Sequence, residues 1–163
     1  MAITHNPLVS DLLPPEEDVT SLLPGPISLY TQISERLSAS DTCDAPASLL
    51  VIGLLHRDGA EPTVTGNRAA ATTVVARSVR GDDWLGRSGP DQLALLLGGG
   101  IHGAVTAAAR VIGEIGALGL PGLGVCAGVT LLEPGVPARE VLRRATTALE
   151  AACATGSGAV SVR

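Results

Sequence analysis

The 163-residue chain contains no lysine and no phenylalanine, and its aromatic rings are limited to Trp84, Tyr30 and three histidines. Without lysine, the chain has neither a P-loop lysine for phosphate binding nor a residue for Schiff-base chemistry. With so few rings, it offers no platform on which single-stranded nucleic acid could stack. All eleven basic residues are arginine, and the formal net charge of −5 argues against a basic surface for DNA.

Cysteines are also few, and membrane or targeting segments are not apparent. Cys43, Cys126 and Cys153 are odd in number and widely spaced, so they fit neither a disulfide framework nor a zinc site. We interpret them as buried or incidental thiols. No apolar run approaches the roughly 18–20 residues of a membrane span, and the N-terminus lacks the basic start of a signal peptide. We expect a cytoplasmic protein that binds neither membrane nor nucleic acid.

What the chain does have is the length and apolar content of one folded domain. Hydrophobic residues make up 45%, which is enough for one substantial core. Residues 1–16 contain three prolines ahead of an acidic run, so we expect an extended tail there and a domain over residues 17–163.

Helical and strand patterns alternate along this domain. The expected elements are a helix at 27–37, a polar linker at 38–48, a strand at 48–55, a loop at 58–66, a helix at 67–79, a hairpin of strands 83–87 and 92–97, a helix at 101–118, a strand at 123–129, a helix at 137–154 and a strand at 159–162. This order predicts an α/β (α+β) fold with a central mixed five-stranded sheet flanked by helices.

Six segments, in this order, resemble the GGDEF domain of bacterial diguanylate cyclases. They are Asp18–Leu22 for the entry motif D-x-L-T-G-L, Leu50–Gly53 for the first strand, Arg80–Asp83 for the inhibitory-site motif RxxD, Arg87–Leu93 for R-x-G-G-D-E-F, Gly124–Val129 for the strand v-t-v-S-x-G-v, and Arg144–Leu149 for R-A-D-x-A-L. The resemblance implies the nucleotide-cyclase palm fold, with the element order β-α-α-β-β-α-β-α-β.

The resemblance also locates the metal-binding positions of the family, and most of them differ here. Gly53 stands where active members have a metal-binding Asp. In the hairpin turn Asp91 is kept, but Gln92 replaces the following acid and Pro90 replaces the second glycine. Joining two GTP molecules requires two divalent cations held by hard oxygen ligands. We therefore expect a degenerate site without cyclase activity, catalytic Mg²⁺ or another cofactor.

The family contacts to phosphate and guanine are also altered. Cys153 lies near the place of a family lysine, and Ser157 lies where an arginine follows Gly156. The loop from His56 to Gly66 is several residues shorter than the guanine-binding region of the family, and Asn67 is the one remaining candidate from it. His56 and His102 have no potential ligands at metal spacing, so we interpret both as ordinary loop residues.

The inhibitory-site motif survives as Arg80 and Asp83. Arginine can fork onto the acceptor edge of guanine, and a carboxylate accepts from its donor edge. In the family this site binds cyclic di-GMP, usually as an intercalated dimer, with help from another arginine, for which Arg77 and Arg110 are candidates. An exposed ion pair near a helix end would produce the same sequence pattern.

Two functional hypotheses remain open. The first is a catalytically inactive GGDEF-like regulatory protein that binds cyclic di-GMP through Arg80 and Asp83 and signals to an unidentified protein partner. The second is a protein-interaction module that binds no nucleotide, in which residues 1–38 or apolar helix faces dock a partner or a second copy in a homodimer.

Overall fold

The structure is a computed structural model that describes residues 22–40, 45–57 and 61–163. Its elements follow the order predicted from the hydrophobic pattern: α1 (Pro26–Ser40), β1 (Ala47–His56), α2 (Glu61–Ser78), β2 (Trp84–Gly89), β3 (Gln92–Gly98), α3 (Ile101–Ala117), β4 (Leu123–Leu132), α4 (Ala138–Thr155) and β5 (Val160–Val162). The two consecutive helices that the resemblance implies after the first strand are not found, because the described residues between β1 and β2 form the single helix α2. The expected tail, Cys43 and all but the last residue of the entry motif lie outside the described residues. No helix in the described ranges is long and apolar enough to cross a bilayer.

The five strands form one mixed sheet, as predicted, and their order in it is β2-β3-β1-β4-β5. The central strand β1 pairs antiparallel with both β3 and β4, and β5 adds to β4 in parallel. The residues from Leu49 to Ile52 are each at most 3% exposed. A continuous apolar run of this kind is typical of a strand that is covered on both faces.

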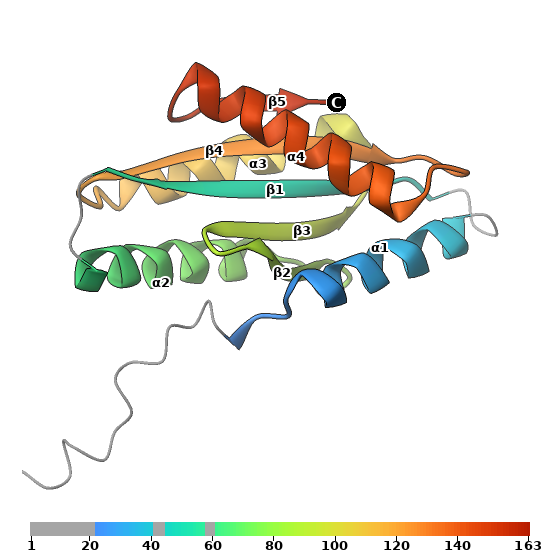
Figure 1. Ribbon diagram of the computed structural model, residues 1–163, viewed down its shortest axis with the longest axis horizontal. Coiled ribbons are helices and arrows are strands. Elements are labelled where there is room, and N and C mark those ends of the chain that lie inside the picture. The colour runs from blue at the N-terminus through green and yellow to red at the C-terminus, as the bar shows by residue number, and fades with distance from the viewer. Residues whose placement is uncertain (1–21, 41–44, 58–60) are drawn as a thin grey trace, which may run out of the picture.

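Helices cover both faces of the sheet (Figure 1), where α4 crosses in front of β1 and β4 and α3 lies behind β4. Because successive strand side chains point to opposite faces, β1 contributes to two cores. Leu50 packs in the core formed with α2 and α3, whereas Leu49 packs in the core formed with α1 and α4. The two layers of helices account for both buried sides of the sheet.

Helix α4 lies unusually close to β4 because Gly128 has no side chain. A Cβ atom at this position would lie 2.7 Å from the carbonyl oxygen of Ala145, which is inside van der Waals contact. Gly128 is the glycine of the segment that resembles v-t-v-S-x-G-v. The glycine in that motif therefore has a packing role in this chain.

Two loop predictions were wrong. Residues 61–66 belong to α2 rather than to a loop, because Pro62 falls in the first helical turn, where the missing N–H has no intrahelical partner to lose. Residues 38–40 belong to α1 rather than to a linker. There the Ser38 hydroxyl is satisfied within the helix, because it donates to the carbonyl of Ser34 at 3.0 Å. Strand β4 also runs three residues further than predicted, to Leu132.

Candidate functional site

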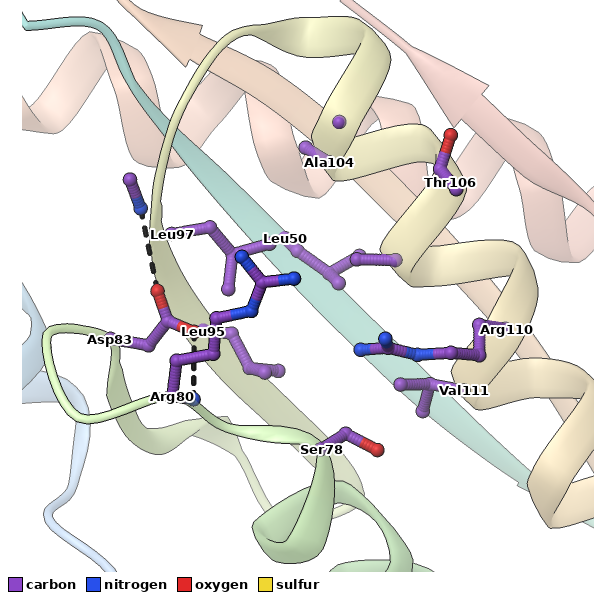
Figure 2. A pocket seen from close by; sticks show the side chains of 13 residues that line it. Leu50, Ser78, Arg80, Asp83, Leu95, Leu97, Ala104, Thr106, Arg110 and Val111 are labelled. Carbon is purple, nitrogen blue, oxygen red and sulfur yellow. Dashed lines mark hydrogen bonds between the residues drawn. The ribbon is translucent and has the colours of Figure 1, made fainter.

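A pocket of about 290 Å³ lies between the end of α2, the sheet and α3 (Figure 2). Arg80 and Asp83 reach it from the turn that joins α2 to β2, and Arg110 reaches it from α3. Three of the four residues predicted to bind ligand thus line one pocket. The fourth, Arg77, is exposed in the last turn of α2 and does not line it.

The RxxD segment is folded on itself by hydrogen bonds to Asp83. Its Oδ2 accepts from the backbone N–H of Arg80 at 3.0 Å, and its Oδ1 accepts from the backbone N–H of Gly98 at 3.4 Å. A carboxylate has about four lone-pair sites, so each oxygen can still accept a bond from a ligand. The carboxylate therefore shapes the turn that presents Arg80 and keeps its capacity to accept.

The guanidinium groups of Arg80 and Arg110 point into the pocket from opposite walls (Figure 2). Over the described ranges, neither guanidinium has a hydrogen-bond or ion-pair partner. The exposed ion pair of Arg80 with Asp82 or Asp83, the alternative that the sequence raised, is not formed among the described residues. The two guanidinium groups exceed the one carboxylate of the pocket, Asp83, by one positive charge, so the pocket is a favourable place for an anion.

The floor of the pocket is apolar. It is formed by side chains of the sheet and of α3: Leu50, Leu95, Leu97 and Val111. On the α3 wall, Gly103, Ala104 and Ala107 leave space that larger residues would fill. An apolar floor with a few polar groups at its rim is the usual form of a small-molecule site, and it suits a planar ring.

At the other end of β3, the fold brings together the positions that hold metal in the family. Gly53 of β1 pairs with Gln92 of β3 in the sheet register. A Cβ at Gly53 would lie 3.1 Å from Cδ1 of Leu149 and 3.3 Å from Sγ of Cys126. The side chain of Gln92 is occupied within the hairpin, because its Oε1 accepts from the Ser88 hydroxyl at 3.0 Å.

The retained carboxylate, Asp91, is bound by two basic side chains of the protein itself. Its Oδ1 accepts from Nη2 of Arg68 at 2.9 Å and from Nε of the same guanidinium at 3.0 Å. His56 Nε2 lies 3.1 Å from the same oxygen. His56 is the last residue of β1 and His102 is the second residue of α3, so the interpretation of both as loop residues was wrong. The sequence gives no signal for Arg68, since helix and hairpin meet only in the tertiary structure.

These residues do not fit a Mg²⁺ ion, which needs hard, anionic oxygen ligands. The position of the first ligand has no side chain and faces Leu149 and a cysteine. The remaining carboxylate, Asp91, is already in contact with the Arg68 guanidinium. Among the described residues, no three His, Cys, Asp or Glu side chains are grouped as metal ligands.

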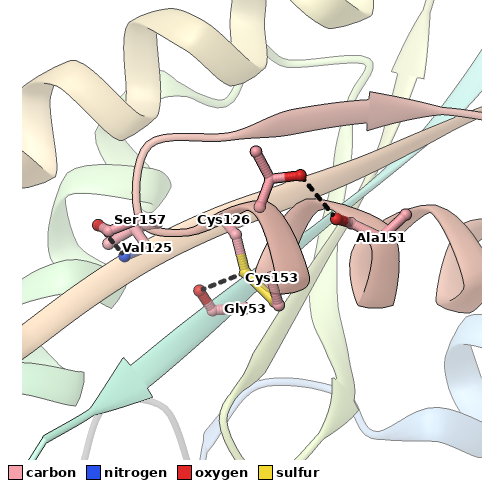
Figure 3. Close-up of a disulfide and its surroundings, with 7 residues drawn as sticks. Gly53, Val125, Cys126, Ala151, Cys153 and Ser157 are labelled. Carbon is pink, nitrogen blue, oxygen red and sulfur yellow. Dashed lines mark hydrogen bonds between the residues drawn. A yellow bond between two sulfur atoms is a disulfide. The ribbon is translucent and has the colours of Figure 1, made fainter.

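A disulfide joins Cys126 of β4 to Cys153 in the last turn of α4 (Figure 3). The prediction that these cysteines are free thiols was wrong. The close contact of α4 with β4 at Gly128 brings the two Cα atoms to 5.5 Å, although the residues are 27 apart in sequence. Disulfides are rare in reducing compartments, and the cytoplasmic location remains a prediction.

The other altered family positions serve internal contacts. The Ser157 hydroxyl accepts from the backbone N–H of Val125 at 3.1 Å (Figure 3). The Asn67 amide is buried and donates to the carbonyl of Pro121 at 2.9 Å. The Asn67 side chain is therefore not available to a nucleotide, whereas the Ser157 hydroxyl is exposed and can still donate one hydrogen bond.

Arg144, the first residue of the segment that resembles R-A-D-x-A-L, is likewise paired within α4. Its Nε donates to Glu140 at 3.1 Å. Hydrogen bonds from Arg143 and then from Arg144 lower the pKa of Glu140 to about 2. This part of the motif thus forms a charge network on the helix surface.

The sequence matches no family model and no curated protein. The fold, in contrast, matches solved GGDEF domains. A coiled coil and GGDEF domain of DgcB from Caulobacter crescentus, in complex with c-di-GMP, gives a TM-score of 0.78 at 16% identity, over 86% of this chain and 82% of that one. The active GGEEF domain of a diguanylate cyclase from Vibrio cholerae gives a TM-score of 0.75 at 16% identity, over 86% and 97% of the chains.

A third match is the diguanylate cyclase SiaD from Pseudomonas aeruginosa, solved in complex with its activator SiaC. It gives a TM-score of 0.77 at 18% identity, over 86% of this chain and 59% of that one. The order of the elements, the mixed five-stranded sheet and these matches agree. The chain has the fold of the GGDEF domain.

Proposed function

We propose that this chain is a catalytically inactive GGDEF-like regulatory protein that binds cyclic di-GMP and signals through contacts with another protein. The observation that carries the proposal is the pair of guanidinium groups, Arg80 and Arg110, that face each other over an apolar floor without a protein partner. Arg80 and Asp83, the two defining residues of the RxxD motif, both line this pocket. Solved structures of this fold include GGDEF domains in complex with c-di-GMP, which supports the same ligand here.

The pocket offers the contacts that a guanine nucleotide requires. Arginine binds phosphate or the O6 and N7 acceptors of guanine with two parallel hydrogen bonds. The free lone pairs of Asp83 can accept from the base N–H groups. Leu97 and Ala107, the more accessible apolar residues of the lining, provide surface for the ring. Binding therefore combines two positive charges, one acceptor and a flat apolar wall.

The proposal of inactivity rests on the metal-binding positions. Gly53 supplies no ligand, Gln92 is neutral and bonded to Ser88, and Asp91 is bonded to Arg68. Catalysis by this family depends on cations that neutralise the triphosphate and activate the attacking hydroxyl. We therefore propose that cyclic di-GMP is a regulatory ligand and that no catalytic Mg²⁺ is bound.

Isothermal titration calorimetry with cyclic di-GMP tests the proposal. Arg80→Ala removes charge-assisted hydrogen bonds worth about 1.5–3 kcal/mol each, so we expect binding to weaken at least about tenfold. Arg77→Ala is the matched control, because this exposed arginine lies three residues away and outside the pocket. No binding by the wild type, or equal affinity for wild type and Arg80→Ala, would refute the proposal.

One observation favours the interaction module as the second candidate. Ile27 is 86% exposed and Tyr30 is 49% exposed on α1, at a spacing that puts them on one helix face. An exposed apolar pair of this kind suits contact with a partner or a second copy. Capture of a partner in pull-downs that is lost in Ile27→Glu, and that does not change with cyclic di-GMP, would favour this candidate over the first.

A further inference from the structure

A second pocket, of about 220 Å³, lies where the end of α3 meets the start of β4 and the turn between α4 and β5. None of the described residues that line it also lines the first pocket. Helix α3 contributes to both, since Val111 lines the first pocket and Ile112 lines the second. The two pockets are therefore separate sites on one helix.

The wall of the second pocket is aliphatic and uncharged. Its larger side chains are Ile112, Ile115, Leu120, Leu123 and Val125. Ile115 and Val125 are buried, at 2% and 5% exposure, whereas the other three are partly exposed. No Asp, Glu, Arg or His occurs among the described residues that line the pocket. A charged ligand would lose its water here without gaining a partner, so this pocket selects a neutral molecule.

Ser157 supplies the one polar side chain of the described lining. Its hydroxyl oxygen accepts from the backbone N–H of Val125 at 3.1 Å. Its own O–H has no acceptor in the part of the chain that the structure describes. Because Ser157 is exposed, we place this hydrogen-bond donor at the rim of the pocket, where it can bind an acceptor atom of a ligand.

Gly116 keeps the pocket open at a position where the fold does not require glycine. It lies in the last turn of α3, where glycine is less favourable than alanine. It is not among the described glycines with positive φ, and an added Cβ would meet no atom within 4 Å. The backbone and the packing would therefore both accept a side chain here, and we expect that side chain to narrow the pocket.

The other two glycines of the lining differ from Gly116 in this respect. Gly119 has a φ of 63° and Gly158 has a φ of 89°, so their backbone conformation accounts for the absence of a side chain. Gly116 is thus the lining position at which the size of the pocket can be changed without strain.

The volume suits a small organic molecule. An apolar cavity of roughly 150 Å³ takes up benzene, so a pocket of about 220 Å³ has room for a slightly larger molecule. We propose that this pocket binds a small, neutral, aliphatic molecule with a carbonyl oxygen. The aliphatic part packs on Ile115 and Val125, and the carbonyl oxygen accepts from the Ser157 hydroxyl. This site goes beyond the proposed function and does not depend on the binding of cyclic di-GMP.

Titration of the full chain with cyclohexanone, followed by the NMR shifts of the backbone amides, tests the proposal. We expect saturable shifts at Ile112, Gly116 and Leu123. Gly116→Leu should weaken binding at least about tenfold, because its side chain takes up the space of the ligand. Gly113→Leu is the matched control and should bind as the wild type does. Gly113 is also a glycine of α3 with no atom within 4 Å of an added Cβ, but it does not line the pocket.

Ser157 provides an independent variant. Loss of one neutral hydrogen bond in Ser157→Ala should weaken cyclohexanone about two- to tenfold, whereas Ser157→Thr, which keeps the hydroxyl, should restore binding. Cyclohexanecarboxylate should bind more weakly than cyclohexanone, because its charge finds no partner. Equal affinity of Ser157→Ala and the wild type, or a preference for the carboxylate, would overturn the assignment of a neutral carbonyl ligand.

Two further results would overturn the site itself. One is the absence of saturable shifts in the wild type, or equal affinity in Gly116→Leu and Gly113→Leu. The other is a set of shifts at the same amides that grows with protein concentration without cyclohexanone, which would identify a second copy of the chain as the occupant. Gly116→Leu should bind cyclic di-GMP as the wild type does, so failure of this proposal is distinguishable from failure of the proposed function.

Discussion

Gly53 lies opposite Cys126 on the neighbouring strand β4, and the side chain of Leu149 covers it from α4. An aspartate at this position would direct its carboxylate against a sulfur and an apolar side chain. Burying a charge without a partner costs several kcal/mol. The residue that removes the metal ligand thus also makes the contact of α4 with the sheet possible.

We predict that restoring the two acidic positions does not restore catalysis. The Gly53→Asp, Gln92→Glu double variant should form no product from GTP with Mg²⁺ or Mn²⁺, because Arg68 still binds Asp91 and the phosphate contacts are absent. Its free energy of unfolding should fall by about 2–4 kcal/mol, from overpacking and charge burial at Gly53. Chromatography of the products and urea denaturation measure the two effects.

Gln92→Glu alone is the control for this variant. Gln92 is only partly buried in the hairpin, so the single change should leave the unfolding free energy within about 0.5 kcal/mol of the wild type. Product from the double variant, or equal stability for the double and single variants, would contradict the prediction.

At the scale of the elements, two features hold α4 against β4. One is the close approach at Gly128, and the other is the bond between Cys126 and Cys153 at the end of the helix. The Ser157 hydroxyl continues the attachment by binding the backbone next to Cys126. The end of α4 that carries phosphate-binding groups in the family is therefore anchored to the sheet here.

Removal of the disulfide should lower stability and leave the pocket intact. The bond closes a loop across a sequence separation of 27, for which chain entropy predicts about 3–4 kcal/mol of stabilisation. We expect Cys153→Ser to lose this amount in urea denaturation, and a reducing dithiol to have the same effect on the wild type. Cys43→Ser, which leaves the bond unchanged, is the control. Equal stability with and without reductant would contradict the disulfide.

At the scale of the whole molecule, the candidate pocket and the positions of Gly53 and Gln92 lie at opposite ends of β3. Gln92 begins this strand and Gly98 ends it. Seven residues of strand separate the two by roughly 20 Å. A ligand bound in this pocket would therefore not need to contact the hairpin turn, so residues of the turn could differ without altering the pocket.

Binding should be visible in the stability of the whole domain. A ligand at one hundred times its Kd stabilises the native state by about 2.7 kcal/mol, which for a chain of this size corresponds to a rise in Tm of roughly 5–10 °C. We expect this shift with cyclic di-GMP, as measured by differential scanning fluorimetry. Arg77→Ala should show the same shift, and Arg80→Ala should show little at the same concentration. A full shift in Arg80→Ala would contradict the assignment of the site.

The order of helices and strands and the RxxD turn were predictable from the sequence because each depends on short-range pattern, and a mixed sheet was expected from that order. Apolar periodicity defines the elements, and Arg80 and Asp83 lie within one turn of chain, where Asp83 accepts from the backbone of Arg80. The sequence likewise showed that Gly53 and Gln92 stand at positions where the resemblance implies acidic residues.

Only the tertiary structure decided which distant side chains meet. Arg110 rather than Arg77 joins the pocket, and Arg68 reaches Asp91. The pairing of Cys126 with Cys153 belongs to the same class. Each of these contacts joins elements that the sheet order and the packing of helices bring together, and no local sequence pattern records that placement.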